Sequence, residues 1–257
     1  MAEAKMKTAS DNQSALSRGF QLVEWVITHG RPVSSAEAAE ALQLPKPTVH
    51  RIAQQLEEIG ILQRAPNSKK FTGGRRLSAI SQAALAHGQV GSARHVILQQ
   101  LSDEIQETCN CTILDGNQLT YFDRVEANWP MRIHLPVGSK VPLHATAGGK
   151  LFLAMLPKPQ RQSLLNSLPL SSFTDTTITD RDALEIQLDT IRQQEMSEDN
   201  GEFIEGLIAI AVPVYDANQR ICFAIAVHAP SVRRSIAELK TFLPNVKQAA
   251  TRLSETL

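Results

Sequence analysis

The sequence is poor in cysteine and has no long apolar runs. Three cysteines occur in 257 residues, at Cys109, Cys111 and Cys222. An odd, sparse set makes a poor disulfide framework, so the sequence favours a reducing compartment. No apolar stretch approaches the ~20 residues that a membrane-spanning helix needs, and no apolar signal core follows the polar residues 1–10. We therefore expect a cytoplasmic protein without a membrane partner.

The chain also lacks a net charge, because 26 Lys and Arg are balanced by 26 Asp and Glu. The two signs are unevenly distributed. Residues 1–92 hold 11 basic and 7 acidic side chains, whereas residues 93–257 hold 15 basic and 19 acidic side chains. A length of this order suffices for one large domain or two ordinary ones. A mildly basic front half joined to a mildly acidic back half indicates that only the front half meets a polyanion.

Residues 13–76 carry the pattern of a small helical domain, preceded by a tail, 1–12, that we expect to be disordered. Apolar residues at helical spacing predict a first helix that ends at Gly30. These residues are Leu16, Phe20, Val23, Val26 and Ile27. Ser34 and Glu37 then stand at the spacing of a capping box. This pair predicts the start of a second, short helix.

The third predicted helix, over 46–59, has one apolar and one polar face. Val49, Ile52 and Leu56 face inward at helical spacing. The outward side chains are hydrogen-bond donors, with no acid before Glu57: Lys46, Thr48, His50, Arg51, Gln54 and Gln55. A helix that enters the major groove of DNA needs such a face. The alternative is an ordinary helical hairpin with a solvated polar face, which would leave the short turn and the following basic hairpin unexplained.

That basic hairpin consists of two short strand-like runs, 61–64 and 69–72, on either side of a turn. Lys69 and Lys70 lie where a wing would contact the DNA backbone. A helix, a helix-turn-helix and a hairpin, in this order, are typical of a winged helix-turn-helix. The front half therefore predicts a domain that binds double-stranded DNA.

The back half mixes helices and strands. Residues 77–92 are Ala-rich and free of proline, which predicts a linker helix, and we expect dimerisation through it because a two-fold operator matches a two-fold protein. Further helices are predicted over 93–108, 149–155, 181–194 and 231–256. Strands are predicted over 109–114, 118–125, 132–135, 209–215 and 221–228. Turn signals between paired runs indicate hairpins, so 93–257 predicts an α+β domain on a largely antiparallel sheet.

Several ordered blocks of sequence are similar to the isocitrate-lyase-regulator (IclR) family of bacterial transcription factors, over nearly the whole chain from Ala15 to about Pro230. The front-half blocks are Ser17-Arg18-Gly19-Phe20 and Leu44-Pro45-Lys46-Pro47-Thr48-Val49-His50-Arg51. The back-half blocks include Leu114-Asp115-Gly116, Asp123-Arg124-Val125, Pro142-Leu143-His144-Ala145-Thr146-Ala147 and Asp199-Asn200-Gly201-Glu202. Two positions depart from the pattern. Pro47 replaces the usual Ser or Thr, and Glu195 replaces the usual Gly, which leaves the shape of that loop open.

The resemblance implies a winged-helix domain, a linker helix used for dimerisation and a GAF-like effector domain. It also implies homodimers, or dimers of dimers, bound to palindromic operators near the promoters of catabolic genes. The residues similar to the family's DNA contacts are Arg18, Ser35, Thr48, His50 and Arg51. We accordingly expect a transcriptional regulator with no enzymatic activity, cofactor or metal site.

Effectors of the family are commonly small carboxylates or aromatic compounds, held between the sheet and its covering loops. The matching positions here are Ala147, Gly148, Asp199, Leu207, Ala209, Ala226 and His228. Backbone N–H groups at the start of the helix from Gly149 would favour an anion. Arg132 could pair with a carboxylate or be an exposed strand cation, and His228 could be a ligand contact or a structural histidine. Members that bind a very small oxoacid have hydroxyl side chains near Ala226 and His228. Their replacement here favours a less polar pocket and, within the organic acids, an aromatic acid.

The cysteines allow two rival interpretations. Cys109 and Cys111 alternate on a strand and so share a face; without further ligands nearby, buried structural thiols are favoured over a metal site. A redox-sensing regulator would use these two with Cys222. A hydrolytic enzyme would pair Cys109 or Cys222 with His144 or His228, but no nucleophile motif accompanies them and the helix-turn-helix would have no purpose.

Overall fold

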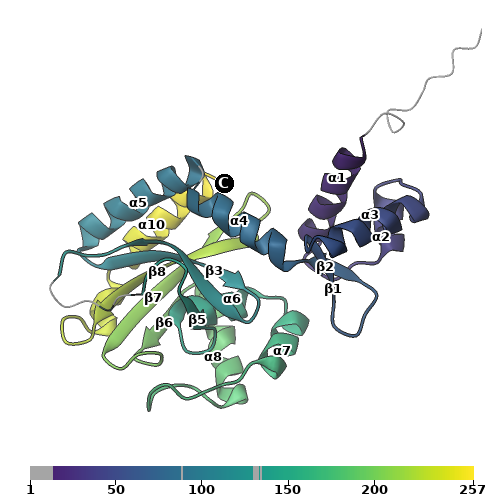
Figure 1. Cartoon of the computed structure of the whole chain (residues 1–257). Helices are drawn as coiled ribbons and strands as arrows, with labels where there is room; N and C mark the ends of the chain where they lie inside the picture. The colour runs from purple at the N-terminus through teal and green to yellow at the C-terminus, as the bar shows by residue number, and fades with distance from the viewer. Residues whose placement is uncertain (1–13, 88, 130–132, 134) are drawn as a thin grey trace, which may run out of the picture. The chain divides into compact units, whose positions relative to one another are not determined.

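The computed structural model describes residues 14–87, 89–129, 133 and 135–257 (Figure 1). The expected disordered tail and Arg132 therefore lie outside the described residues. The chain divides into two compact units, Met1–Ala83 and Ala84–Leu257, and the division falls within the segment interpreted as a linker. Across the described ranges, no helix is long and apolar enough to cross a membrane.

The N-terminal unit is a winged helix-turn-helix. Its elements are α1 (Ala15–Thr28), α2 (Ser35–Ala41), α3 (Lys46–Glu58), β1 (Leu62–Arg64) and β2 (Phe71–Gly73). The predicted capping box at the start of α2 is confirmed, because the Ser34 hydroxyl accepts from the Glu37 amide and the Glu37 carboxylate accepts from the Ser34 amide. β1 pairs antiparallel with β2, and Val33 adds a bridge to Phe71.

A small apolar core holds the three helices against the hairpin. The buried stripe of α1 runs through Leu22 and Val26, whereas Leu16 and Phe20 are exposed. The core residues are Leu22, Val26, Val33, Ala38, Ala39, Val49, Ile52, Ala53, Leu62 and Phe71. The burial of Val49 and Ile52 fixes which face of α3 remains available to a partner.

The C-terminal unit is built on a six-stranded antiparallel sheet with the order β5-β4-β3-β8-β7-β6. Its strands are β3 (Thr108–Asp115), β4 (Gln118–Val125), β5 (Lys140–Pro142), β6 (Ser197–Asn200), β7 (Leu207–Tyr215) and β8 (Ile221–Pro230). The helices from the wing to the C-terminus are α4 (Arg75–His87), α5 (Gln89–Ile105), α6 (Ala147–Met155), α7 (Lys158–Ser167), α8 (Arg181–Gln194), α9 (Ile236–Lys240) and α10 (Leu243–Ser254). The predicted α+β class is confirmed.

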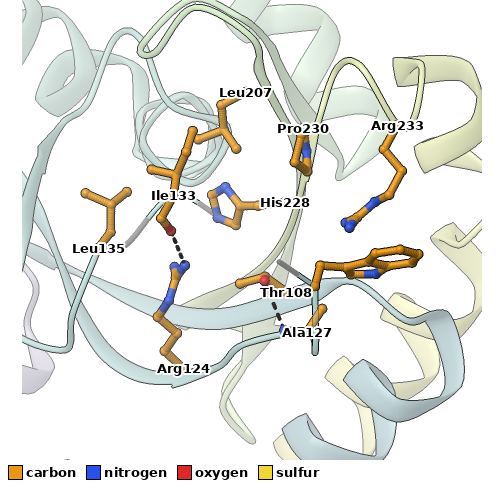
Figure 2. Close-up of a pocket in the computed structure, with 10 residues that line it drawn as sticks. Thr108, Arg124, Ala127, Ile133, Leu135, Leu207, His228, Pro230 and Arg233 are labelled. Carbon is orange, nitrogen blue, oxygen red and sulfur yellow. Dashed lines mark hydrogen bonds between the residues drawn. The ribbon is translucent and has the colours of Figure 1, made fainter. Parts of the chain in front are cut away.

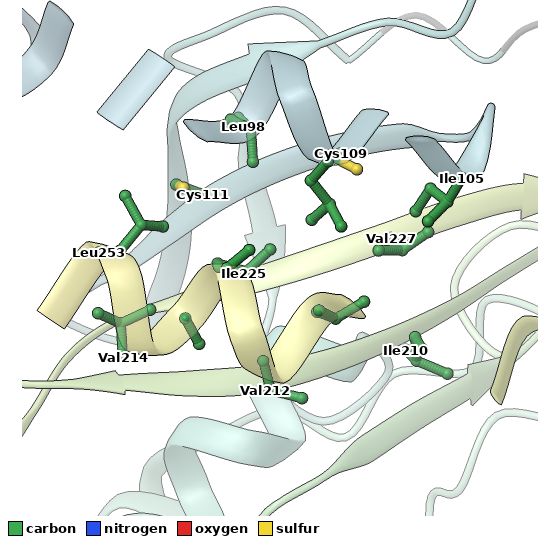
Figure 3. Close-up of a cluster of buried hydrophobic side chains, with 14 of the residues drawn as sticks. Leu98, Ile105, Cys109, Cys111, Ile210, Val212, Val214, Ile225, Val227 and Leu253 are labelled. Atoms are coloured by element: carbon green, nitrogen blue, oxygen red, sulfur yellow. The ribbon is translucent and has the colours of Figure 1, made fainter. Parts of the chain in front are cut away.

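Helices cover both faces of this sheet. α5, α9 and α10 pack on one face and form a large apolar core with side chains such as Val212 and Ile225 (Figures 1 and 3). Cys109 and Cys111 lie in this core, fully buried and on one face of β3 as expected. α6, α7 and α8 cover the opposite face, where the sheet contributes mostly small side chains. The two faces of the sheet thus belong to two separate layers.

Two predicted elements differ from the structure. Ile133 and Leu135, the described residues of the expected strand 132–135, are not in a strand, and the edge of the sheet is β5 instead. The Ile133 carbonyl accepts a hydrogen bond from the Arg124 side chain, at 2.8 Å, rather than from a neighbouring strand. The helix expected over 231–256 is broken into α9 and α10, with a proline in the first turn of α10.

The ends of the helices account for the smaller differences. The helix predicted over 93–108 ends at Ile105, because Gln106 adopts a positive φ of 58° and Thr108 begins β3. Glu195 ends α8 in the left-handed conformation, with φ 50°. Glycine adopts this conformation without strain, so the backbone keeps the shape that the family's usual glycine would have here. Neither α7 nor β6 was predicted.

Candidate effector site and DNA-binding surface

The polar face of α3 is exposed. Its N-cap, Pro45, offers no side-chain hydrogen bond, and Pro47 has no N–H, so the Lys46 amide is the backbone donor of the first turn that has no acceptor within the helix. The predicted contacts that are exposed are Lys46, His50, Arg51, Gln54, Lys69 and Lys70. Those that are partly buried are Arg18, Ser35 and Thr48. Donors on the helix and on the β1–β2 loop give this unit the chemistry of a DNA-binding surface.

In the C-terminal unit, the predicted effector positions lie on the sheet face beneath α6. Side chains that are directly opposite in an antiparallel sheet point to the same side. One such row consists of Asp199, Ala209, His228 and Thr108. The next row consists of Ser197, Ala211, Ala226, Asn110 and Arg124. Polar side chains therefore flank a central floor of alanines.

Several polar atoms on this face are buried without a partner. Within the described part of the chain, no hydrogen-bond partner lies near Asn110 Nδ2 and Oδ1, Thr112 Oγ1, Ser197 Oγ, Glu202 Oε2 or the two ring nitrogens of His228. Leaving a buried polar group unsatisfied destabilises a protein by about 1–3 kcal/mol for each group. So many of these groups on one face are the expected property of a site that a polar ligand fills.

The N-terminus of α6 lies against the same face. The helix begins at Ala147, two residues before the predicted start, and the Thr146 hydroxyl caps it by accepting from the Gly149 amide at 3.2 Å. The amides of Ala147 and Gly148 remain as donors that have no acceptor within the helix. A Cβ atom on Gly148 would lie 2.9 Å from Thr112 Oγ1, so only glycine allows this close approach. The helix start therefore packs closely against the polar side chains of this sheet face.

A pocket opens at the end of the first row (Figure 2). Its lining residues are Thr108, Arg124, Ala127, Trp129, Ile133, Leu135, Leu207, His228, Pro230 and Arg233. Arg124 Nη2 donates to the Ile133 carbonyl at 2.8 Å and Arg124 Nε donates to Glu126 at 3.3 Å. Burial, together with the charge of Arg124, lowers the pKa of His228 to about 3. The imidazole is therefore neutral near pH 7, with one donor and one acceptor nitrogen.

Asp199 lies at the other end of that row. Burial, to which the charge of Glu202 adds, raises the pKa of Asp199 to about 7. Asp199 Oδ1 accepts from the Glu202 amide at 2.7 Å, and Glu202 itself forms a buried ion pair with Lys150. A carboxyl group with this pKa is in part protonated near neutral pH, and its protonated form can donate a hydrogen bond to a ligand.

Arg124 and Asn110 are among the residues of this site that the sequence reasoning missed. Arg124 stands in the block Asp123-Arg124-Val125, and an oppositely charged pair within a predicted strand was the available signal. Asn110 separates Cys109 from Cys111, so the alternation that placed both thiols in one layer already placed Asn110 in the other. Arg132, expected to meet a carboxylate, lies outside the described residues.

The rival interpretations of the cysteines find little support. Cys109 is directly opposite Val227 in the sheet, so its thiol faces away from the layer that holds His228. The His144 ring is engaged with the Ser171 carbonyl at 2.9 Å. Burial raises the pKa of both the Cys109 and the Cys111 thiols, which disfavours the thiolate that redox sensing or nucleophilic attack requires. Among the described residues, no group of three or more His, Cys, Asp or Glu side chains could hold a metal ion.

A winged helix-turn-helix joined to an α+β unit with a polar internal site defines a DNA-binding transcriptional regulator with a C-terminal effector-binding domain. Residues 15–66 match the IclR helix-turn-helix domain, and residues 82–255 match the bacterial transcriptional regulator IclR C-terminal domain. The chain belongs to the IclR family of transcriptional regulators.

Individual proteins agree with this assignment. The chain is 42% identical over 248 residues to the "Probable transcriptional regulator SauR" of Cupriavidus necator, which covers 96% of this chain and 98% of that protein. Thermotoga maritima IclR has the same fold, with a TM-score of 0.64 at 24% identity over 94% of this chain and 98% of that one. The inducer-binding domain of PobR from Acinetobacter, a double mutant in complex with 3-hydroxybenzoic acid, gives a TM-score of 0.61 at 25% identity, over 65% of this chain and 98% of that one.

Proposed function

We propose that this regulator controls catabolic genes as a homodimer, or a dimer of dimers, on a palindromic operator, and that a small organic acid sets its affinity for DNA. The observation that carries the proposal is the cluster of buried polar atoms without partners beneath the N-terminus of α6. Donors on the helix and the sheet favour an anion there, because backbone N–H groups at a helix start are an anion-binding feature.

In the proposed DNA complex, α3 enters the major groove and the β1–β2 loop contacts the backbone. Arg51, His50 and Gln54 lie on the exposed face of α3 and would reach base edges or phosphates. Lys69 and Lys70 on the loop would contact phosphates. A single unit of this size covers one half-site, so a palindromic operator calls for two copies of the chain.

Within the organic acids, we propose a hydroxylated aromatic acid. Ala209, Ala211, Ala224 and Ala226 make the sheet face beneath α6 apolar and free of bulky side chains, and such a face suits a ring better than a two-carbon acid. The carboxylate would lie near the amides of Ala147 and Gly148, or near Arg124. Asp199 in its protonated form would donate to a neutral oxygen, since two facing carboxylates repel one another. The 3-hydroxybenzoic acid bound to the related PobR domain supports this class.

A thermal-shift screen of the full chain tests the proposal. The probes are 3-hydroxybenzoate, 4-hydroxybenzoate, benzoate, glyoxylate and pyruvate, and a ligand that binds only the folded state raises the unfolding temperature. We expect the hydroxybenzoates to raise it most. The substitution Ala226→Leu would fill the floor and abolish the shift, whereas Ala217→Leu, on the exposed β7–β8 turn, would keep it. The proposed class would be contradicted if the oxoacids raised the unfolding temperature and the aromatic acids did not.

A further inference from the structure

We infer that Asn110 is an effector-binding residue that recognises an uncharged polar group of the effector, such as a hydroxyl, separately from its carboxylate. The inference rests on the proposed function, because it concerns the same site. Neither the resemblance to the family nor the matching relatives assigned a role to this side chain.

The position of Asn110 places its amide on the sheet face that α6 covers, where we propose the effector site. Asn110 is fully buried on β3, directly opposite Ala226 on β8 and Arg124 on β4. Ala226 is too short to offer a partner, and Arg124 donates to Ile133 and Glu126 instead. Cys109 and Cys111 on either side of Asn110 point into the opposite layer. The amide therefore lies on the sheet face that α6 covers, the layer of the proposed effector site.

The hydrogen-bonding state of Asn110 distinguishes a recognition group from a structural one. Neither its donor Nδ2 nor its acceptor Oδ1 has a partner among the described residues. A buried structural asparagine would use these atoms to hold a neighbouring backbone, as Thr108 does when its Oγ1 accepts from the Ala127 amide at 3.1 Å. Leucine has the same number of side-chain heavy atoms in the same branched arrangement, is somewhat larger, and would leave no unsatisfied polar atom at this position. Asparagine here thus lowers the stability of the ligand-free protein and leaves two hydrogen-bonding atoms unused.

Thr112 extends this feature toward α6. It follows Asn110 by two residues on β3, so both side chains lie on one face, and Thr112 Oγ1 also lacks a partner. The same oxygen lies close to Gly148 at the helix start. Asn110 and Thr112 are uncharged and offer both donors and acceptors. They complement a hydroxyl, while the cation of Arg124 and the amides of α6 complement the carboxylate.

Thermal unfolding of the full chain without added acid tests whether the Asn110 and Thr112 side chains lack hydrogen-bond partners in the free protein. We expect Asn110→Leu and Thr112→Val to keep the unfolding temperature or to raise it by about 2–4 °C. The matched control is Thr108→Val on the same strand, which should lower the temperature because it leaves the Ala127 amide unpaired. A fall with Asn110→Leu as large as that of the Thr108→Val control would overturn the inference, since Asn110 would then have a structural partner.

Binding of 3-hydroxybenzoate and benzoate tests the recognition itself. We expect the wild-type chain to prefer 3-hydroxybenzoate, and Asn110→Leu to reduce this preference about tenfold with little change for benzoate. If the wild type discriminates and the variant discriminates equally well, the inference is wrong while the proposed effector class stands. If neither acid binds the wild-type chain but Asn110→Leu still stabilises the free chain, the proposed effector class is wrong. The interpretation of Asn110 as a recognition group without a partner in the free protein is then supported.

Discussion

Asp123 and Arg124 are neighbours on β4, yet their side chains serve opposite faces of the sheet. Asp123 accepts hydrogen bonds from Arg94 Nε and His95 Nδ1 of α5, both at 2.8 Å. Arg124 lines the pocket on the other face, beside His228 (Figure 2). One peptide unit thus joins the proposed effector site to α5, the helix that follows the linker.

The first prediction concerns this Asp123 anchor. Asp123→Asn removes the charge opposite Arg94, whose side chain is only 2% exposed. Leaving a buried charge without its counter-charge destabilises a fold by about 3 kcal/mol or more, and we expect a loss of that order in the free energy of unfolding measured with urea. Asp115→Asn serves as the control, because its pair with exposed Lys140 is worth under about 1 kcal/mol. Equal losses in the two variants would contradict this account of the anchor.

The second prediction concerns DNA contact by α3. Arg51→Ala should weaken operator binding by about 1–3 kcal/mol if Arg51 reads a base, because a bidentate contact is lost. The measurement is a mobility-shift titration at fixed salt, with circular dichroism to confirm the fold. Arg181→Ala, on the exposed start of α8, should leave affinity unchanged. An Arg51→Ala variant that is folded and binds as tightly as the wild type would exclude this contact.

The third prediction is the oligomeric state. We expect sedimentation at micromolar concentration to show a dimer or a larger assembly, because a two-fold operator is matched by a two-fold protein. Deletion of residues 1–92, which removes the whole predicted linker, should leave a monomer, because we expect dimerisation through that segment. A full-length chain that remains monomeric with and without DNA would argue decisively against the proposed dimer.

The fourth prediction uses the raised pKa of Asp199. The folded chain holds this proton up to about pH 7, whereas the unfolded chain releases it near 3.8. The contribution of Asp199 to stability is therefore fully present below about pH 4 and is lost as the pH rises through 7. In Asp199→Asn the side chain stays neutral, so the variant should gain relative to the wild type by about 1 kcal/mol per pH unit over this window. Urea unfolding at pH 5.5, 6.5 and 7.5 measures the difference, and a pH-independent difference would refute the raised pKa.

Periodic patterns and capping signals predicted most of the fold. Val49 and Ile52 showed the buried side of α3, and Ser34 with Glu37 showed the start of α2, because both signals are local. The strand expected at 132–135 failed for a reason that is not local. The Ile133 carbonyl is bound by a side chain from β4, and only the tertiary structure brings Arg124 to it. β6 was missed because its alternation is short and polar, as in Ser197 and Asp199.

The sequence predicted only some of the residues that the structure brings together on this face. Asp199, Ala226 and His228 came from resemblance, and the register of β6, β7 and β8 brings them onto one face. The sequence does not show which buried polar groups lack hydrogen-bond partners. Asn110 is an ordinary polar residue in the sequence, and only the structure shows that its amide is buried without partners. Likewise, only the structure distinguishes Arg124 from the other basic residues, because it shows that Arg124 lines the pocket.

The division of the sheet into two layers has a consequence for how such regulators diversify. Along β7 and β8, residues such as Ile210 and Ile225 belong to the core with α5 and α10, whereas Ala211 and Ala226 belong to the floor beneath α6. Alternate codons therefore encode two different layers, one packed on α5 and α10 and the other beneath α6, where we propose that the effector binds. Substitutions at the floor can accumulate in a lineage without eroding the core on the other side. A duplicated gene could acquire a new inducer by drift at these few alanine positions while its DNA-binding unit stays untouched.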